Sequence, residues 1–181
     1  MRVISGKYKG RSLEGFSILG TRPTMDRIKE SLFAMIQNKI DNSCSLDLFS
    51  GSGNLGIEAL SEGAKKVYFV DKNRKAYTTI CRNLDKLGVG CDKVFCMDYI
   101  KALNYFASLN LVFDVIFLDP PYATDFITKS IFSIVDNHLL AKDGIIVCES
   151  DSLERIDIPL CLKIVKSKKY GDKVVAILQY V

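Results

Sequence analysis

Residues 46–60 read LDLFSGSGNLGIEAL, and the prediction of the fold starts from this stretch. A short apolar run passes into three glycines, Gly51, Gly53 and Gly56, spaced G-x-G-x-x-G, and then into a segment with helical periodicity. Glycines at this point of a strand-turn-helix unit let the backbone turn tightly and approach a ligand without a Cβ in the way. The helix that follows offers free backbone amides to a polar group. The stretch therefore predicts the first strand, ligand loop and helix of an α/β domain.

Strand-like and helix-like segments alternate on the C-terminal side of this unit. Their apolar runs are nearly continuous, which is typical of parallel strands covered by helices on both faces. The tail, residues 162–181, reads as two strands around a Lys/Gly turn, and so predicts an antiparallel edge. We therefore predict a doubly wound, mostly parallel α/β fold. Its first strand and helix are expected at 44–50 and 54–64, further strands at 66–71, 93–98, 113–119 and 144–150, and further helices at 74–88, 99–109 and 124–140.

The N-terminal region has a different pattern. Residues 1–15 alternate loosely and contain three glycines, so we predict a short β-hairpin or an extended arm. Residues 21–40 predict a helix that is capped by Thr24 and carries one apolar stripe. Arg27 and Lys29 fall off that stripe, and we expect both to be exposed to water.

Charge is segregated along the 181 residues. Residues 1–40 hold eight Lys or Arg against three Asp or Glu, and residues 161–181 hold five against one. Residues 41–160 hold twelve against seventeen, so both ends are basic and the middle is acidic. This asymmetry favours a polyanionic partner, although scattered solvated lysines explain the charge equally well. We divide the chain into a basic arm and helix, 1–40, and a main domain, 41–181, expected to form one compact unit.

Composition indicates an ordinary globular protein, with 48% hydrophobic and 25% charged residues. No apolar run approaches the roughly 18 to 20 residues of a membrane span, and the first ten residues lack the apolar core of a signal peptide. We therefore expect a cytoplasmic protein with no membrane partner. The six cysteines lack C-x-x-C spacing and His138 is the only histidine, so we predict reduced cysteines, no metal site and a structural role for His138.

Acidic residues recur where the predicted strands end. Asp71 follows the second strand, twenty residues beyond Gly51, where a carboxylate can accept both hydroxyl hydrogens of a ribose. A nicotinamide dinucleotide would fit these two features. However, Asp47 would repel a pyrophosphate and suits an ammonium group, and Asp98 or a neighbouring amide could read an adenine amino edge. The set favours an adenosine joined to an amino acid.

In this order, the motifs LDLFSGSG, FVD, CMD and LDPPY resemble those of the class I S-adenosylmethionine (SAM) dependent methyltransferases. The resemblance implies a Rossmann-like seven-stranded sheet with the last strand antiparallel, and SAM as cofactor. The segments ISGKYKGRSL and TRPTMDRIKESLFAMI are, in addition, similar to the family that methylates a guanine N2 in 16S ribosomal RNA. The implied cofactor-binding residues are Asp47, Phe49, Gly51, Ser52, Gly53, Asp71, Met97 and Asp98.

Residues 119–122, Asp-Pro-Pro-Tyr, end the fourth predicted strand. An exocyclic amine is a poor nucleophile because its lone pair is delocalised into the ring. We expect the Asp119 carboxylate and the Pro120 carbonyl to hold its two N–H bonds, so that the lone pair faces the sulfonium methyl. Pro120 and Pro121 keep the turn rigid, and Tyr122 offers a flat face on which the base stacks.

The Asp-Pro-Pro-Tyr motif does not identify the amine. It also resembles the adenine-N6 DNA methyltransferases, although those usually carry a target-recognition domain for which this chain has no room. A nucleotide-binding module without transferase activity is the third possibility. Our first interpretation is a monomeric enzyme that recognises ribosomal RNA, free or in a small-subunit assembly particle. Phosphate and base contacts are expected from Arg2, Lys7, Tyr8, Lys9, Arg11, Arg22, Thr24 and Arg27, and more weakly from Lys166, Lys168, Lys169 and Tyr170.

Overall fold

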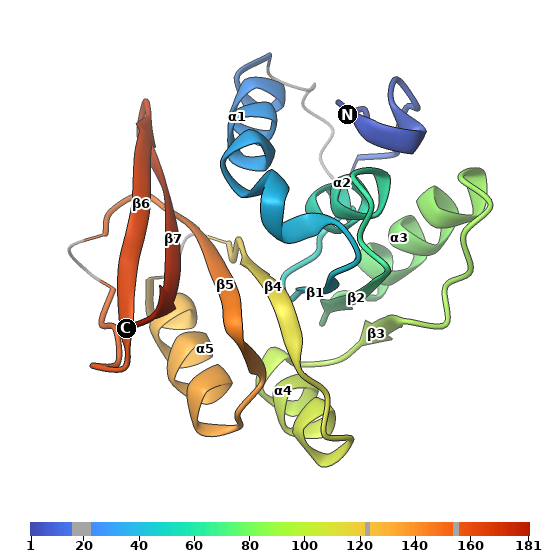
Figure 1. Ribbon diagram of the computed structural model, residues 1–181. Helices are drawn as coiled ribbons and strands as arrows, with labels where there is room; N and C mark the ends of the chain where they lie inside the picture. Colours follow the sequence, from blue (N-terminus) through green and yellow to red (C-terminus); the bar gives the residue numbers. More distant parts are fainter. Residues whose placement is uncertain (16–22, 122–123, 154–155) are drawn as a thin grey trace.

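A seven-stranded sheet forms the centre of the computed structural model, which describes residues 1–15, 23–121, 124–153 and 156–181 (Figure 1). The strand order is β3-β2-β1-β4-β5-β7-β6. Pairs from β3 to β5 are parallel, whereas β7 runs antiparallel to both of its neighbours. The strands are β1 Cys44–Asp47, β2 Lys66–Asp71, β3 Val94–Cys96, β4 Phe113–Leu118, β5 Leu140–Ser150, β6 Leu162–Tyr170 and β7 Lys173–Tyr180.

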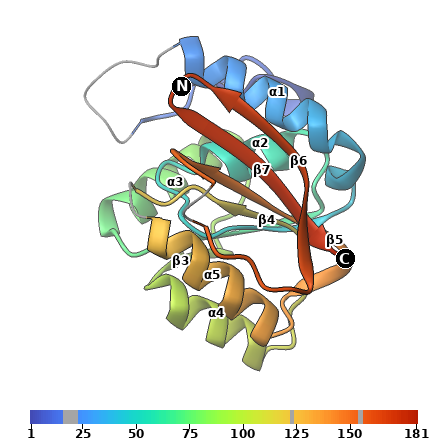
Figure 2. The ribbon, with the colours of Figure 1, turned by 90° about the vertical axis from the view of Figure 1, so that its left-hand side faces the viewer.

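Helices cover both faces of the sheet, as Figure 2 shows. One face packs against α1, α2 and α3, and the other against α4 and α5. The doubly wound α/β fold and the antiparallel last strand are thereby confirmed. The helices are α1 Pro23–Ile40, α2 Asn54–Ser61, α3 Arg74–Lys86, α4 Tyr99–Ser108 and α5 Thr124–Asp136, with a short 3-10 turn, η1, at Gly6–Tyr8.

The central strands show why the apolar runs are continuous. On β4, Val115 and Phe117 pack in the core beneath α1 to α3, while Ile116 and Leu118 pack in the core beneath α4 and α5. All four side chains are at most 1% exposed. Successive strand residues point to opposite faces, so a strand that is buried on both faces needs an apolar residue at every position.

Several predicted boundaries were wrong. α1 begins at Pro23, so Thr24 lies inside the helix instead of capping it, which agrees with the preference of proline for the first helical position. α5 ends at Asp136 rather than 140, because His138 takes a positive φ of 53° and turns the chain. β5 then begins at Leu140, four residues earlier than predicted.

The first fifteen residues form neither a regular hairpin nor a free arm. Their only bridge joins Arg2 to Ser12, and η1 lies between these residues. The segment packs against α2, where the N–H groups of Ile4 and Ser5 donate to the Glu58 carboxylate at 3.0 and 2.8 Å. Sequence alternation could not show this, because the partners are helix residues far along the chain.

Lys29 is buried, so the expectation that it would be exposed was wrong. Its side chain is 3% exposed and its Nζ lies 2.7 Å from Oε2 of Glu58, which is 1% exposed. Lys29 Nζ also donates to the Arg2 carbonyl and to Asn54 Oδ1, both at 2.8 Å. Burial lowers the pKa of Lys29, while the Glu58 charge opposes this shift. These contacts join the N-terminal segment, α1 and the start of α2.

The glycines of the N-terminal segment provide a matched test of this packing. Gly6 and Gly10 have φ of +74° and +81°, but only at Gly6 would an added Cβ overlap a neighbour, the backbone of Ser61. We expect Gly10→Ala to cost about 1 kcal/mol, from backbone strain alone. Gly6→Ala should cost about 3 kcal/mol or more, measured by urea unfolding, and should speed tryptic cleavage after Lys7. Equal losses for both variants would contradict the packed arrangement.

Two further findings concern the described residues. All six cysteines are free thiols. Within residues 1–15, 23–121, 124–153 and 156–181, no helix is both long enough and apolar enough to cross a bilayer.

Candidate active site

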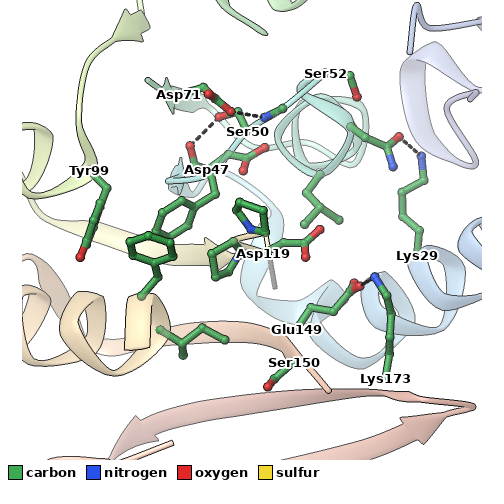
Figure 3. Close-up of a pocket in the computed structure, with 18 of the residues that line it drawn as sticks. Lys29, Asp47, Ser50, Ser52, Asp71, Tyr99, Asp119, Glu149, Ser150 and Lys173 are labelled. Carbon is green, nitrogen blue, oxygen red and sulfur yellow. Dashed lines mark hydrogen bonds and ion pairs between the residues drawn. The ribbon is translucent and has the colours of Figure 1, made fainter. Parts of the chain in front are cut away.

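A cavity of about 730 Å³ opens at the carboxyl ends of the central parallel strands (Figure 3). Its volume is in the range of small-molecule and cofactor sites, and its position at this edge of the sheet is where doubly wound folds bind ligands. The predicted site residues that line it are Asp47, Phe49, Gly51, Ser52, Asp71, Asp98, Asp119, Pro120 and Pro121.

The glycine loop forms the cavity wall between β1 and α2. Gly51 and Gly53 adopt positive φ of 54° and 81°, which only glycine takes without strain. The N–H of Gly53 donates to the Ser50 carbonyl at 2.7 Å and closes the turn. Gly56 lies in α2, where an added Cβ would overlap the ring of Phe69 on β2. The first two glycines thus shape the turn, and the third allows close helix-to-strand packing.

Asp71 lies at the end of β2 and lines the cavity. Its Oδ2 accepts from the Gly51 N–H at 2.9 Å, and its Oδ1 accepts from the Asn73 N–H at 2.8 Å. These bonds hold the carboxylate beside the loop and leave further lone pairs for a ligand. A ribose would therefore meet an acceptor whose position is already set.

Asp47 ends β1 and is only 2% exposed. Its Oδ2 accepts from the Gly56 N–H at 2.9 Å, so it supports the start of α2 as well as lining the cavity. Burial raises the pKa of Asp47 to about 7, and the nearby charges of Asp119 and Asp71 act in the same direction. The ionised form of Asp47 is therefore unfavourable at this buried position, and a positively charged ligand group would stabilise it.

This raised pKa predicts a pH-dependent stability. Because the folded-state pKa is about 7 and the usual value is 3.8, the contribution of Asp47 to stability is fully present below about pH 4 and is lost as the pH rises through 7. An asparagine at this position would still accept the Gly56 N–H without the charge, so Asp47→Asn should raise the free energy of unfolding at pH 8 by about 2–4 kcal/mol. At pH 4 the difference should nearly vanish. Urea titrations at both pH values test this, and a pH-independent difference would contradict it.

Of the two predicted cofactor-binding residues that follow β3, only one lines the cavity. Asp98 lines the cavity, but its Oδ1 also caps α4 by accepting the Ile100 N–H at 3.0 Å. Met97 packs into the core beneath α4 and α5, and its N–H donates to the Asp71 carbonyl at 3.1 Å. Neither Gly53 nor Met97 lines the cavity, so both support the residues that do.

An aromatic cluster lies near Asp98. The Phe49 ring centroid lies 5.2 Å from that of Tyr99 and 6.2 Å from that of Phe126, and all three residues line the cavity. Tyr99 and Phe126 meet edge to face at 5.5 Å. An apolar aromatic wall beside a hydrogen-bonding group suits a heteroaromatic base. Sequence patterns singled out Phe49 but neither of its partners.

Asp119 follows β4 directly and is half-buried at the cavity wall. Burial and then the charge of Glu149 raise the pKa of Asp119 to about 7, while Lys173 opposes the shift. Pro120 is buried and Pro121 exposed, and both line the cavity beside it. Tyr122, the last residue of the motif, lies outside the described residues.

The candidate RNA-binding residues of the N-terminal region lie on the surface. Lys7, Lys9, Arg11 and Arg27 are exposed, whereas Arg2 forms an ion pair with Asp26 at 3.4 Å, at the start of α1. Tyr8 is partly buried beneath the Lys7 ammonium, which lies 5.2 Å from its ring centroid. Arg22 and the side chain of Thr24 lie outside the described part of the chain.

The basic hairpin of β6 and β7 partly serves packing. Lys168 and Tyr170 both hydrogen-bond Ser31 on α1, at 3.0 and 2.5 Å. Lys166 donates to the Met35 carbonyl at 3.3 Å. These contacts fix the hairpin against α1, while its lysines stay mostly exposed.

Sequence reasoning did not identify several cavity residues. Glu149 is the penultimate residue of β5 and forms an ion pair with Lys173 of β7, and both line the cavity. An acid at a strand end was the available signal for Glu149, since the same signal had identified Asp71 and Asp119. Nothing in the pattern marked Asn83 either, which does not line the cavity but supports the glycine loop: it is 0% exposed and donates to the Ser52 carbonyl at 2.9 Å.

Comparisons with known proteins agree with this geometry. The sequence profile of the family described as "Conserved hypothetical protein 95" matches residues 1–179. A Bacillus subtilis protein named "Putative rRNA methyltransferase YlbH" is 42% identical, over 98% of this chain and 97% of the relative. "Ribosomal RNA small subunit methyltransferase D" of Haemophilus influenzae is 32% identical, over 94% and 89%. The structure titled "Putative methyltransferase yhhF from Escherichia coli" superposes with a TM-score of 0.85 at 28% identity, over 99% and 97% of the two chains.

Proposed function

Since this chain belongs to the family described as Conserved hypothetical protein 95, we propose that it transfers a methyl group from SAM to the N2 amine of a guanine in 16S ribosomal RNA. The resemblance to rRNA methyltransferases found in the sequence motifs is confirmed at the level of the family. The chain is a class I methyltransferase that acts on ribosomal RNA, and it uses SAM as its cofactor. The choice of guanine N2 is the finer part of the proposal.

One observation carries the proposal, namely that Asp71, Asp47 and Asp119 line a single cavity at successive strand ends. SAM supplies an activated methyl group on a sulfonium. The protein therefore has to bind SAM, orient the acceptor amine and let the released proton leave. Asp71 would bind the ribose of SAM and Asp47 would bind its ammonium group. The adenine would lie against the aromatic cluster, next to Asp98. Asp47 is well suited, because a cation would stabilise its buried charge.

The acceptor base would approach from the side of Asp119. Its amine would donate to the Asp119 carboxylate and the Pro120 carbonyl, which leaves the nitrogen lone pair directed at the methyl group. Since the sulfonium is already a good leaving group, Asp119 or water needs only to take the proton released after transfer. The target base has to leave its stack to reach this depth.

The substrate would be gripped by the exposed basic residues. A folded RNA or a small-subunit particle would supply part of the specificity through its shape. Arg2, Lys7, Lys9, Arg11 and Arg27 would contact its phosphates, which predicts binding that weakens as salt rises. We propose that the protein acts as a monomer.

A methyl-acceptor assay tests the function. The protein is incubated with radiolabelled SAM and 16S ribosomal RNA, either free or in assembly particles from cells that lack the enzyme. Mass analysis of the digested nucleosides should find N2-methylguanosine. N6-methyladenosine would instead support the adenine alternative, and label in neither nucleoside would favour a binding module without transferase activity.

A further inference from the structure

Methyl transfer at Asp119 requires neither Glu149 nor Lys173, yet both line the same cavity. Strand register explains why they lie beside Asp119. Leu118 of β4 pairs with Cys148 of β5, so Asp119 and Glu149 are the next residues along two adjacent parallel strands. Figure 3 shows Glu149 joined to Lys173 on the side of the cavity that holds Asp119.

The pleat directs all three side chains to one face of the sheet. Side chains two positions apart on a strand share a face. The residues two positions from Asp119, Glu149 and Lys173 all belong to the core covered by α1, and they are Phe117, Val147 and Val175. The carboxylates and the ammonium therefore converge under the N-terminal half of α1, where the acceptor base would enter.

Glu149 and Lys173 present one acceptor and one donor in a partly desolvated place. They form an ion pair, with side chains 16% and 45% exposed. A carboxylate can only accept hydrogen bonds and an ammonium can only donate them. Beside its N2 amine, guanine carries the N1–H donor and then the O6 acceptor. Beside its N6 amine, adenine carries the N1 lone pair, which a carboxylate would repel.

We propose that Glu149 accepts the N1–H of the target guanine and Lys173 donates to its O6, so that this pair selects guanine over adenine. The inference rests on the proposed function, and it assigns base recognition to β5 and β7 while Asp119 positions the amine. A site built to hydrogen-bond a base strongly disfavours an analogue that leaves those groups unpaired or opposed.

An analogue of guanine tests this assignment. In 2,6-diaminopurine the C2 amine remains, but N1 bears a lone pair and an amine replaces O6. We would ligate it into a 16S ribosomal RNA transcript at the mapped target nucleotide and measure kcat/KM against the guanosine transcript. The wild-type protein should prefer guanosine by about 10²-fold or more. A glutamine side chain can turn its amide NH2 towards N1, so Glu149→Gln should reduce that preference by about tenfold.

Two further variants separate recognition from structure. Lys173→Met should lower kcat/KM about tenfold for guanosine but leave the diaminopurine substrate nearly unaffected. Glu30→Gln makes the same chemical change on the exposed side of α1 and should leave the preference unchanged. SAM affinity should be the same in all of these proteins.

The outcomes distinguish the two proposals. If Glu149→Gln and Lys173→Met slow both substrates equally, the pair is structural and the recognition proposal is overturned, while the methyltransferase proposal stands. If the wild-type protein places no methyl group on the guanosine transcript, free or assembled, both proposals fail before any variant is compared.

Discussion

Replacing Asp119 with alanine is expected to lower kcat for methyl transfer by about 10²- to 10³-fold, as when a preorganised polar group is removed from an active site. The amine would lose the acceptor that turns its lone pair towards the methyl group, and a small misplacement of reacting atoms is costly. SAM binding should stay nearly intact, because we propose that Asp71 binds the ribose and Asp47 binds the ammonium group. Single-turnover transfer from labelled SAM and equilibrium dialysis of SAM measure the two effects.

Asp119→Asn is the matched control for this change. Asparagine has the same shape as aspartate and one carbonyl acceptor, so the variant should keep more activity than Asp119→Ala. Neither variant should lose stability at pH 8, since burial raises the pKa of Asp119 and makes its ionised form unfavourable there. Loss of SAM binding together with activity would refute the assignment of Asp119 to the acceptor base.

Much of the fold could be predicted because the deciding features are local. The glycine spacing at 51, 53 and 56 reports a tight turn and a close helix-to-strand contact, and both occur. Continuous apolar runs report burial on both faces, which β4 shows directly. Strand ends were harder, because β5 extends back to Leu140 through a register shift against β4.

Apart from the glycine loop, the residues of the candidate site were predictable where an aspartate lies at the end of a predicted strand. Asp47, Asp71, Asp98 and Asp119 satisfy that rule, and all four line the cavity. Their hydrogen bonds to the backbone could not be foreseen, since the donors lie on loops whose path depends on tertiary packing.

Lys29 shows the opposite case, in which the local pattern misleads. Lys29 falls off the apolar stripe of the helix and is therefore predicted to be solvated, because periodicity records only which face is apolar. Its burial depends on Glu58, 29 residues further along the chain, and on the folded N-terminal segment. Only the assembled structure brings these three parts together.

Lys29→Met is expected to destabilise the protein by about 3–5 kcal/mol, because it leaves Glu58 as an uncompensated buried charge. In a chain of this size the loss corresponds to a melting temperature lower by about 10 °C. Lys39→Met is the matched control. Lys39 lies on the same helix, and its contact with the Asp143 carbonyl is exposed, so this variant should cost less than about 1 kcal/mol.

A double-mutant cycle with Glu58→Gln separates the charge pair from packing. The glutamine of this variant can still accept the N–H groups of Ile4 and Ser5 through its amide oxygen, so the N-terminal segment keeps part of its attachment. Once position 58 is neutral, Lys29→Met should cost much less than in the wild-type protein, because no buried charge remains unpaired. Urea unfolding followed by circular dichroism measures all four proteins. Additive losses would mean that Lys29 stabilises the fold through its contacts with Arg2 and Asn54 rather than through Glu58.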